Sequence, residues 1–474
     1  MSLPTYAGTI NAYRVEYDRQ LGSQQISPFL IPFDILNYVL LITYLLFMHK
    51  LPGASKAPVF LLIVIASMLS VQNSRTLGLA YGVLIGISSS WCILMSMNLL
   101  FFVQPAREFQ RKTLCISSLK HSDRSRSPAK DRTQWQSMPV SASRRFFWIL
   151  DLLGSLRLLH WAYGYHRDRG SSTRSSSCSG GSSGFRRSLG KLLLIYLFID
   201  GLKEIIALDP YFWGYTDSDP PDYIKFYLPG KEIIQAYRML VAFAVIYAAL
   251  ELVTTFGVLL CVNILGPSLA GTWGNKWAYR PQFGKFDSVF TRGLQGFWGA
   301  WWHQMFRFML TSPAKAMINT LHLHKQDVTA RIVGLVVPFL ISGVIHAAGS
   351  YTMWGDSSPI NSFLFFALQP AGIALQITGS RGLCLLGCFS RMPQWIRKAA
   401  NFGFTAIWLL KTFPLLADDF ARGGLWLTEL TEPFPFSLLQ ILGLGSATRS
   451  HSLGIDYRLH IQTGCRWWQV GLAV

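Results

Sequence analysis

The sequence predicts an all-α protein that crosses a membrane about eight times, within a range of about seven to nine spans. The chain is 51% hydrophobic and only 14% charged, whereas soluble proteins have about 25% charged residues. Its mean hydropathy is positive, at +0.30, and several apolar runs are long enough to cross a bilayer. This balance points to a polytopic membrane protein rather than to a soluble domain.

Each predicted span is an apolar run of roughly 20 residues, the length that a helix rising 1.5 Å per residue needs. The predicted spans are Phe29–Met48, Ala57–Val71, Leu77–Val103, Lys191–Leu208, Met239–Leu265, Ile332–Ala348, Asn361–Thr378 and Phe402–Ala417. Phe436–Leu444 is a shorter candidate for a ninth span.

The apolar runs divide the chain into four parts. Residues 1–103 hold N-terminal transmembrane helices, residues 104–188 form a connection without a span, residues 189–445 hold the remaining spans, and residues 446–474 form a C-terminal tail. Residues 1–27 contain no apolar core, so no cleavable signal peptide is predicted, and the first span is expected to direct insertion.

The connection over residues 104–188 is strongly basic. It carries 16 Lys and Arg against 5 Asp and Glu, or +11 of the net charge of +19. Positive residues favour the cytosolic side of a membrane, and its Ser/Gly-rich run is expected to be disordered. We interpret it as a solvated cytosolic loop near anionic headgroups. No nucleic-acid binding is expected, and Phe146–Tyr165 is predicted to lie as an amphipathic segment on the membrane surface.

The seven cysteines are scattered along the chain. No pair has the spacing of a zinc site, so neither a metal site nor a disulfide framework is predicted.

Four acidic residues lie near the ends of apolar runs. They are Asp34, Asp200, Glu204 and Glu251. Because charge within a bilayer is costly, each is a functional candidate by default. We expect these groups to reach the interface or to pair with a neighbour.

His346 is the first candidate for catalysis. It lies within Ile332–Ala348, an otherwise uncharged run, and Ser342 is on the same helical face, four residues earlier. Gly343 leaves room for a second helix or a ligand. A buried imidazole is expected to be neutral, the form that accepts a proton; the alternative is a histidine satisfied within the core.

His303 is the second candidate, within the aromatic stretch "FWGAWWHQMFRFML". Trp residues favour membrane interfaces. A helix dipping in from the interface would carry Trp298, Trp302 and Met305 on one face, with His303 about 100° round from Trp302. The alternative is an aromatic anchor with an incidental histidine.

Together, "FWGAWWHQ" and "FLISGVIHAAG" resemble the wax synthase-like branch of the membrane-bound O-acyltransferases. The residues that carry the resemblance are Phe297, Trp298, Trp302, His303, Ser342, Gly343 and His346. It extends to "WAYRPQFGKFDSV" and "FFALQPAGIALQ", and to "ADDFARGGLWL" with "EPFPFSLL". The similarity covers most of residues 190–445 and is most specific across residues 270–380.

The resemblance implies a multi-helix acyltransferase, with residues 189–445 as its core around a buried catalytic chamber. It implies that His346 serves as the base. It also implies a catalytic role for His303, on weaker grounds than for His346. Fungal members of this branch acetylate hydroxyls of terpenoids and meroterpenoids in secondary metabolism. We therefore expect acetyl-CoA as co-substrate, an apolar alcohol as acceptor, no permanently bound cofactor, and a multi-pass location in the endoplasmic reticulum; the oligomeric state stays open.

Within this mechanism, several side chains are candidates for contact with substrate. The developing oxyanion needs a donor, which His303, Gln304 or an indole N–H of Trp298 or Trp302 could supply. Ser342 is a further binding candidate. Gln369 and Gln376 either line the chamber or bond neighbouring helices. Candidates for a basic mouth toward the CoA phosphates are Arg280, Lys285, Arg292, Arg307 and Lys315.

Other functions remain open at this point. A long-chain wax-ester synthase would share the fold and the base. A transporter would also have many spans, but we find no internal repeat and few charged intramembrane residues. A non-catalytic scaffold is separated from an enzyme only by assay.

Overall fold

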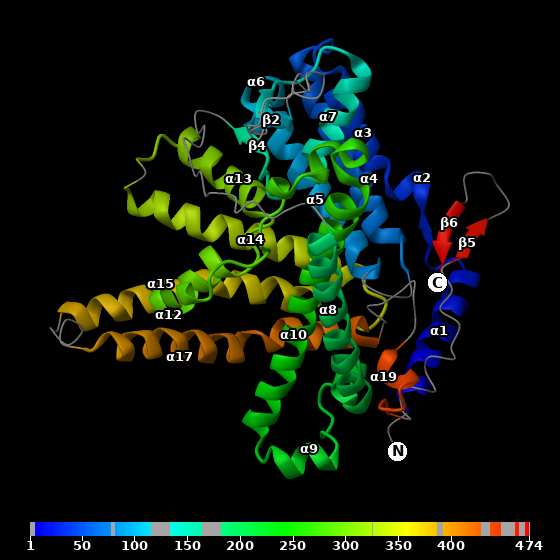
Figure 1. The fold of residues 1–474 in the computed structure, drawn as a ribbon, viewed down its shortest axis with the longest axis vertical. Helices are drawn as coiled ribbons and strands as arrows, with labels where there is room; N and C mark the ends of the chain where they lie inside the picture. The colour runs from blue at the N-terminus through cyan, green and yellow to red at the C-terminus, as the bar shows by residue number, and fades with distance from the viewer. Residues whose placement is uncertain are drawn as a thin grey trace.

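The computed structural model describes residues 5–76, 81–114, 133–163, 182–324, 326–385, 392–427, 437–446, 460–463 and 470–473. Most of these residues are helical, which confirms the all-α class (Figure 1). Helices α14, α15 and α17 run as a layer, and the steep pair α8 and α10 crosses it.

The first half of the chain contains α1 (Tyr6–Gly22), α2 (Ile31–Asp34), α3 (Leu36–Phe47), α4 (Lys56–Asn73), α5 (Tyr81–Met97), α6 (Pro105–Glu108), α7 (Ala142–Gly154), α8 (Ser182–Leu208), α9 (Asp222–Tyr227) and α10 (Lys231–Gly257). The second half contains α11 (Gly266–Ala270), α12 (Asp287–Gly296), α13 (Arg307–Thr320), α14 (Val328–Thr352), α15 (Pro359–Leu385), α17 (Gln394–Thr412), α18 (Pro414–Arg422) and α19 (Leu438–Ile441). Three π-helical segments are η2 (Asn98–Phe102), η5 (Val258–Leu265) and η8 (Phe297–Trp301). Short 3₁₀ turns are η1 (Gly53–Ser55), η4 (Pro210–Trp213), η6 (Gly271–Gly274), η7 (Lys276–Ala278) and η9 (Leu425–Leu427).

Within the described residues, six helical segments are long and apolar enough to cross a membrane. They are Gly53–Asn73, Gly82–Phe102, Lys231–Gly274, Val328–Thr352, Pro359–Gly382 and Gln394–Arg422. Leu36–Phe47 is a shorter apolar helix. On α4, Leu61, Leu62 and Met68 are more than half exposed, as expected for side chains that face lipid.

Three of the predicted spans differ from this set. Phe29–Met48 is divided among β1, α2 and α3, and α3 is too short to be one of the six. α8 covers Lys191–Leu208, but it is not among the six because charged residues interrupt its apolar sequence. Phe436–Leu444 does not form a ninth span, since its helix α19 has only 4 residues.

The acidic residues near span ends pair with neighbours, as predicted. Glu251 forms an ion pair with Lys191 at 2.5 Å. The carboxylates of the other three accept hydrogen bonds as follows: Asp34 from Ser70 and Ser74, Asp200 from the Leu439 N–H, and Glu204 from Ser446 and Gln440.

The basic connection contains an ordered module, which the sequence did not predict. Strands β2 (Phe109–Leu114), β3 (Thr133–Gln136) and β4 (Trp161–Tyr163) form an antiparallel sheet in the order β3-β2-β4. Phe109 and Trp161 of the sheet are buried with Trp148 of α7 in a cluster that includes side chains of α3 and α5. The part of the Ser/Gly-rich run up to residue 181 lies outside the described residues.

The interpretation of Phe146–Tyr165 as a segment on the membrane surface is wrong for its buried face. The helix ends at Gly154, and Trp148, Ile149 and Leu152 are at most 1% exposed within the core. Phe146, Phe147 and Leu150 of the same helix are exposed, so a position of this outer face at the membrane surface stays a prediction.

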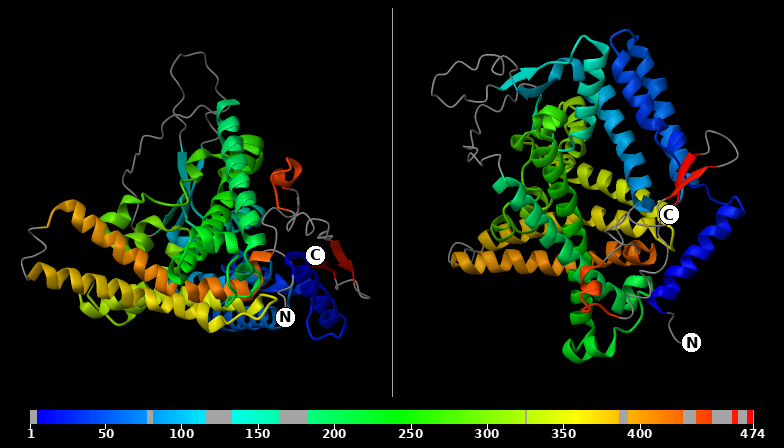
Figure 2. Two further views of the ribbon diagram at one scale, coloured as in Figure 1. Left: turned by 90° about the horizontal axis from the view of Figure 1, so that it is seen from below. Right: turned by 45° about the vertical axis from the view of Figure 1, so that its right-hand side comes forward.

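Part of the C-terminal tail returns to the start of the chain. Strands β1 (Phe29–Leu30), β6 (Val470–Ala473) and β5 (His460–Thr463) form a small sheet in that order. Figure 2 shows this sheet at the edge of the molecule near α1, away from the helical layer.

Candidate active site

α14 holds His346 in one tautomer. The Nδ1 atom of His346 lies 2.8 Å from the backbone carbonyl oxygen of Ser342, one helical turn earlier. Because a carbonyl only accepts, Nδ1 must carry the hydrogen in this contact, which leaves Nε2 of the neutral ring as an acceptor. The ring packs on Phe366 of α15, with centroids 4.1 Å apart. Ser342 thus lies beside His346 as predicted, but through its carbonyl rather than its hydroxyl.

The aromatic stretch is not the single helix expected over residues 292–310. α12 ends at Gly296, and η8 closes with a hydrogen bond from the Trp302 N–H to the Phe297 carbonyl at 2.7 Å. Trp302 is then extended, with ψ at 150°, and α13 begins at Arg307. The expected face of Trp298, Trp302 and Met305 therefore does not form.

The break in the helix places His303 in a loop outside the six spans. Its ring packs against Trp302 and Phe306, at centroid distances of 5.2 and 5.5 Å. Burial and, after it, the nearby imidazole of His346 lower the pKa of His303 to about 3. His303 is therefore neutral near pH 7. Its buried Nδ1 has no hydrogen-bond partner among the described residues.

An aromatic bridge joins the two histidines. Trp298 lies 6.1 Å from Phe366 and 6.3 Å from Trp302, measured between ring centroids. Phe366 contacts His346, and Trp302 contacts His303. These ring contacts link two histidines that belong to different elements, and His346 is near enough to affect the pKa of His303. Phe366 lies in the stretch "FFALQPAGIALQ", but its contact with His346 was not predicted, because it depends on how α14 and α15 pack.

The side-chain amide of Gln304 forms hydrogen bonds within the protein, in the loop that carries His303. Gln304 Nε2 donates to the carbonyl oxygens of Trp302 and Trp298, at 2.6 and 3.2 Å. Its Oε1 accepts from Arg307, which also donates to the Gly299 carbonyl at 3.1 Å. These bonds fix the loop that carries His303.

The two glutamines of α15 bond neighbouring helices, one of the two alternatives left open by their spacing. Gln369 Oε1 accepts from Trp298 Nε1 at 3.1 Å, and its Nε2 donates to the Phe365 carbonyl at 2.7 Å. Gln376 accepts from the Leu294 N–H at 2.9 Å and donates to Asn401 at 3.1 Å. Both side chains hold α12 and η8 against α15.

Trp298→Phe is expected to lower the free energy of unfolding by about 1–3 kcal/mol, the cost of an unsatisfied buried polar group. The change keeps an aromatic ring but leaves Oε1 of Gln369, a residue 0% exposed, without its indole donor. Thermal unfolding in detergent measures the loss. The matched control is Trp395→Phe, at a side chain 71% exposed. Equal unfolding temperatures for the two variants would show that the bond contributes nothing.

All five residues proposed for a basic mouth are exposed: Arg280, Lys285, Arg292, Arg307 and Lys315. Within the described part of the chain, no group of three or more His, Cys, Asp and Glu side chains could hold a metal ion.

A cavity of about 460 Å³ opens beyond Thr352, the C-terminal end of α14. Its lining includes Tyr13, Trp213, Asp356 and Arg422, but neither His303 nor His346. This cavity is therefore distinct from the site between the histidines.

Comparison with known proteins assigns the region that contains both histidines. Residues 279–368 match the sequence model of the membrane bound O-acyl transferase family. The chain is 29% identical over 196 residues to acetyltransferase aurG of Calcarisporium arbuscula, covering 40% of this chain and 45% of the relative. It is 25% identical over 263 residues to acetyltransferase atnC of Arthrinium sp, covering 52% and 56%.

A further relative is O-Mevalon transferase macI of Penicillium terrestre, at 27% identity over 298 residues, with 59% of this chain and 63% of the relative covered. The chain spans about half the length of the first curated relatives that it matches. No solved structure matches it. The chain thus has six candidate spans, and its region around His303 and His346 resembles the membrane bound O-acyl transferase family and the fungal acetyltransferases named above.

Proposed function

We propose that this protein is an acyl-CoA-dependent O-acyltransferase that acetylates a hydroxyl of a terpenoid or meroterpenoid intermediate. The observation that carries the proposal is the arrangement of His346. Its Nδ1–H is bonded to a helix carbonyl, so Nε2 is left as a proton acceptor in the neighbourhood of His303. The names of the fungal relatives, acetyltransferases among them, support the choice of acetyl.

His346 would act as general base in a direct transfer. An alcohol is a weak nucleophile, and a positioned base removes its proton as the oxygen attacks. The O–H proton passes to Nε2 of His346, and the oxygen bonds to the thioester carbonyl carbon. The C–S bond then breaks, and the departing CoA sulfur takes the proton from the imidazolium. No acyl-enzyme is needed.

His303 is the group best placed to contact the reacting carbonyl. The indole N–H of Trp298 and the amide N–H groups of Gln304 already donate to protein oxygens. His303 Nδ1 has no such partner. If this nitrogen carries the ring hydrogen, it can donate to the developing oxyanion, an interaction worth about 2.7–4 kcal/mol of barrier in known enzymes.

A membrane-embedded site suits these substrates. An apolar alcohol reaches the site from the bilayer, and the CoA donor reaches it from the aqueous side that carries the basic module. Exclusion of water limits hydrolysis of the thioester. We place the protein in the endoplasmic reticulum, where lipid-soluble intermediates and cytosolic CoA thioesters meet.

Microsomes that express the chain test this function. They are incubated with radiolabelled acetyl-CoA and a panel of terpenoid alcohols, with vector-only microsomes as the control. Formation of a labelled ester above the control is the expected result. A second series uses long-chain acyl-CoA, because a wax-ester synthase would share the same base. Ester formation only in that series would reassign the donor, and none in either would overturn the proposed function.

A further inference from the structure

The ordered module of the basic connection carries an arginine to the loop that precedes the catalytic region. Arg157 Nη1 donates to the Pro281 carbonyl at 2.7 Å and lies 3.5 Å from the Arg280 carbonyl. The two arginines are 123 residues apart in sequence. Among the described residues, no carboxylate pairs with either one. Arg157 is half-buried, and the neighbouring charge of Arg280, together with burial, lowers its pKa.

A buried polar network fixes the turn that carries Arg157. Ser155 Oγ donates to the Asp151 carbonyl at 2.5 Å and accepts from Trp161 Nε1 at 2.9 Å. His160 Nε2 lies 3.1 Å from Asp151 Oδ1. Leu158, next to Arg157, has a φ of 50°, a left-handed conformation that a leucine adopts only when its surroundings impose it.

The only carboxylate in this network is already used. Asp151 pairs with Arg111 at 3.1 Å and contacts His160. The contacts of Arg157 with the backbone carbonyls of Arg280 and Pro281 therefore place its positive charge beside the segment that carries Arg280. Arg157 is half-buried, so an anion bound beside it would compensate a charge that is partly removed from water, and the exposed Arg280 adds a second positive charge to the same segment.

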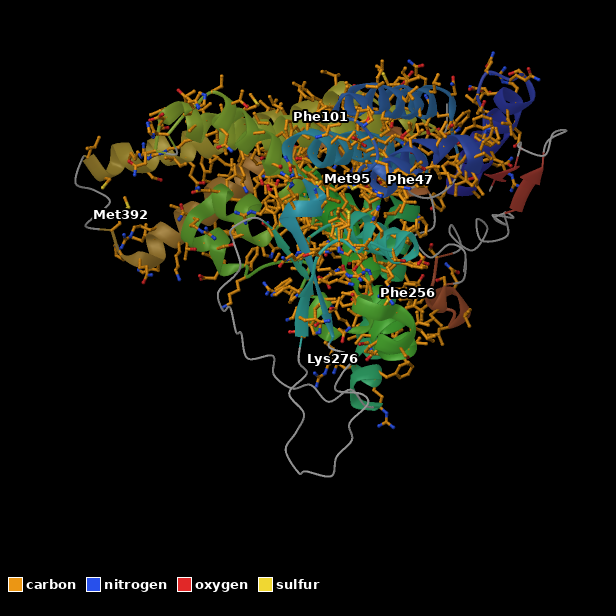
Figure 3. The ribbon with its side chains drawn as sticks, turned by 90° about the horizontal axis from the view of Figure 1, so that it is seen from above. Phe47, Met95, Phe101, Phe256, Lys276 and Met392 are labelled. Atoms are coloured by element: carbon orange, nitrogen blue, oxygen red, sulfur yellow. The ribbon has the colours of Figure 1, made fainter. Side chains whose placement is uncertain are left out.

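The arginine pair lies beside the candidate active site. The charge of Arg157 is close enough to His303 to lower the pKa of that imidazole, after burial and His346. Helix α13, which follows the loop of His303, packs on the module, with Phe308 4.9 Å from Tyr163 between ring centroids. Lys112 Nζ, on β2, lies 5.0 Å from the ring centroid of Trp277. Figure 3 shows the neighbouring Lys276 near the end of the sheet that contains β2.

We propose that Arg157 and Arg280 together bind the phosphate groups of the acyl-CoA donor at the entrance to the site. A guanidinium presents several N–H groups in a plane and matches phosphate oxygens in pairs. The inference rests on the proposed function and deepens it, because it makes the described parts of the module, residues 109–114 and 133–163, part of the donor site. Arg280 was a candidate from the sequence, whereas Arg157 was not.

Binding of acetyl-CoA is measured on the full chain in phosphatidylcholine nanodiscs, in competition with 3′,5′-ADP, which carries phosphates, and with acetyl-pantetheine, which lacks the nucleotide. Arg157→Gln and Arg280→Gln are each expected to weaken acetyl-CoA and 3′,5′-ADP about 10-fold and to leave acetyl-pantetheine unchanged. Arg157→Lys should recover part of the loss. The charge-matched control, Arg331→Gln on the exposed start of α14, should bind as the parent does.

Three results would overturn the inference: a parent that does not bind acetyl-CoA, an Arg157→Gln variant that binds it as the parent does, or equal losses for acetyl-CoA and acetyl-pantetheine. An effect seen only in nanodiscs with anionic lipid would also overturn it, because the pair would then hold a lipid headgroup. Arginine-dependent binding without ester formation supports the donor site and contradicts the proposed function, so the two failures are distinguishable.

Discussion

His346→Ala is expected to lower the rate of ester formation by about 10²- to 10⁴-fold, the usual contribution of a positioned general base. The change removes Nε2, the acceptor that the contact between Nδ1 and the Ser342 carbonyl leaves free. The rate is measured with radiolabelled acetyl-CoA on equal amounts of purified protein. The matched control is His324→Ala, at an exposed histidine of the loop before α14, and it should keep the parent rate.

Folding must be separated from catalysis in this comparison. His346 also packs on Phe366, so the variant loses one ring contact. Its thermal unfolding is therefore recorded beside that of the parent. A folded His346→Ala protein with an undiminished rate would make the base assignment wrong and move the role to His303.

Gly86→Ala is expected to lower the free energy of unfolding by at least about 1–3 kcal/mol, the cost of overpacking a core. A Cβ at Gly86 would lie 1.9 Å from the carbonyl oxygen of Ala348, so α5 and α14 would have to separate. Because α14 carries His346 only a few residues earlier, ester formation should fall together with the unfolding temperature.

The control for this variant is Gly201→Ala within α8. A Cβ there meets no atom within 4 Å, and alanine is the better helix former. The Gly201 variant should therefore unfold at or above the temperature of the parent. If Gly86→Ala behaved in the same way, the close approach of α5 and α14 would be wrong.

The sequence predicted those features that depend on local composition. Long apolar runs indicated the spans. The cost of a polar side chain in an apolar environment singled out His346 and His303. The i to i+4 spacing placed Ser342 against His346. These inferences need only the periodicity of a helix and the free energy of burial.

The features that escaped prediction depend on contacts between distant segments. The helix break after Trp301 is accompanied by a hydrogen bond from the Gly284 N–H to the Trp301 carbonyl at 2.9 Å. The meeting of Arg157 with Arg280 depends on a sheet within a segment whose charge suggested only a solvated loop. No local pattern encodes either contact.

The central claim is that His346 accepts the proton of the acceptor hydroxyl. The most direct test compares acetyl transfer by the parent and by His346→Ala to one terpenoid alcohol and to its thiol analogue. A thiol is much more acidic than an alcohol and needs less help from a base. The account predicts a far greater loss for the alcohol than for the thiol. Equal losses would contradict it and leave His346 with a structural role.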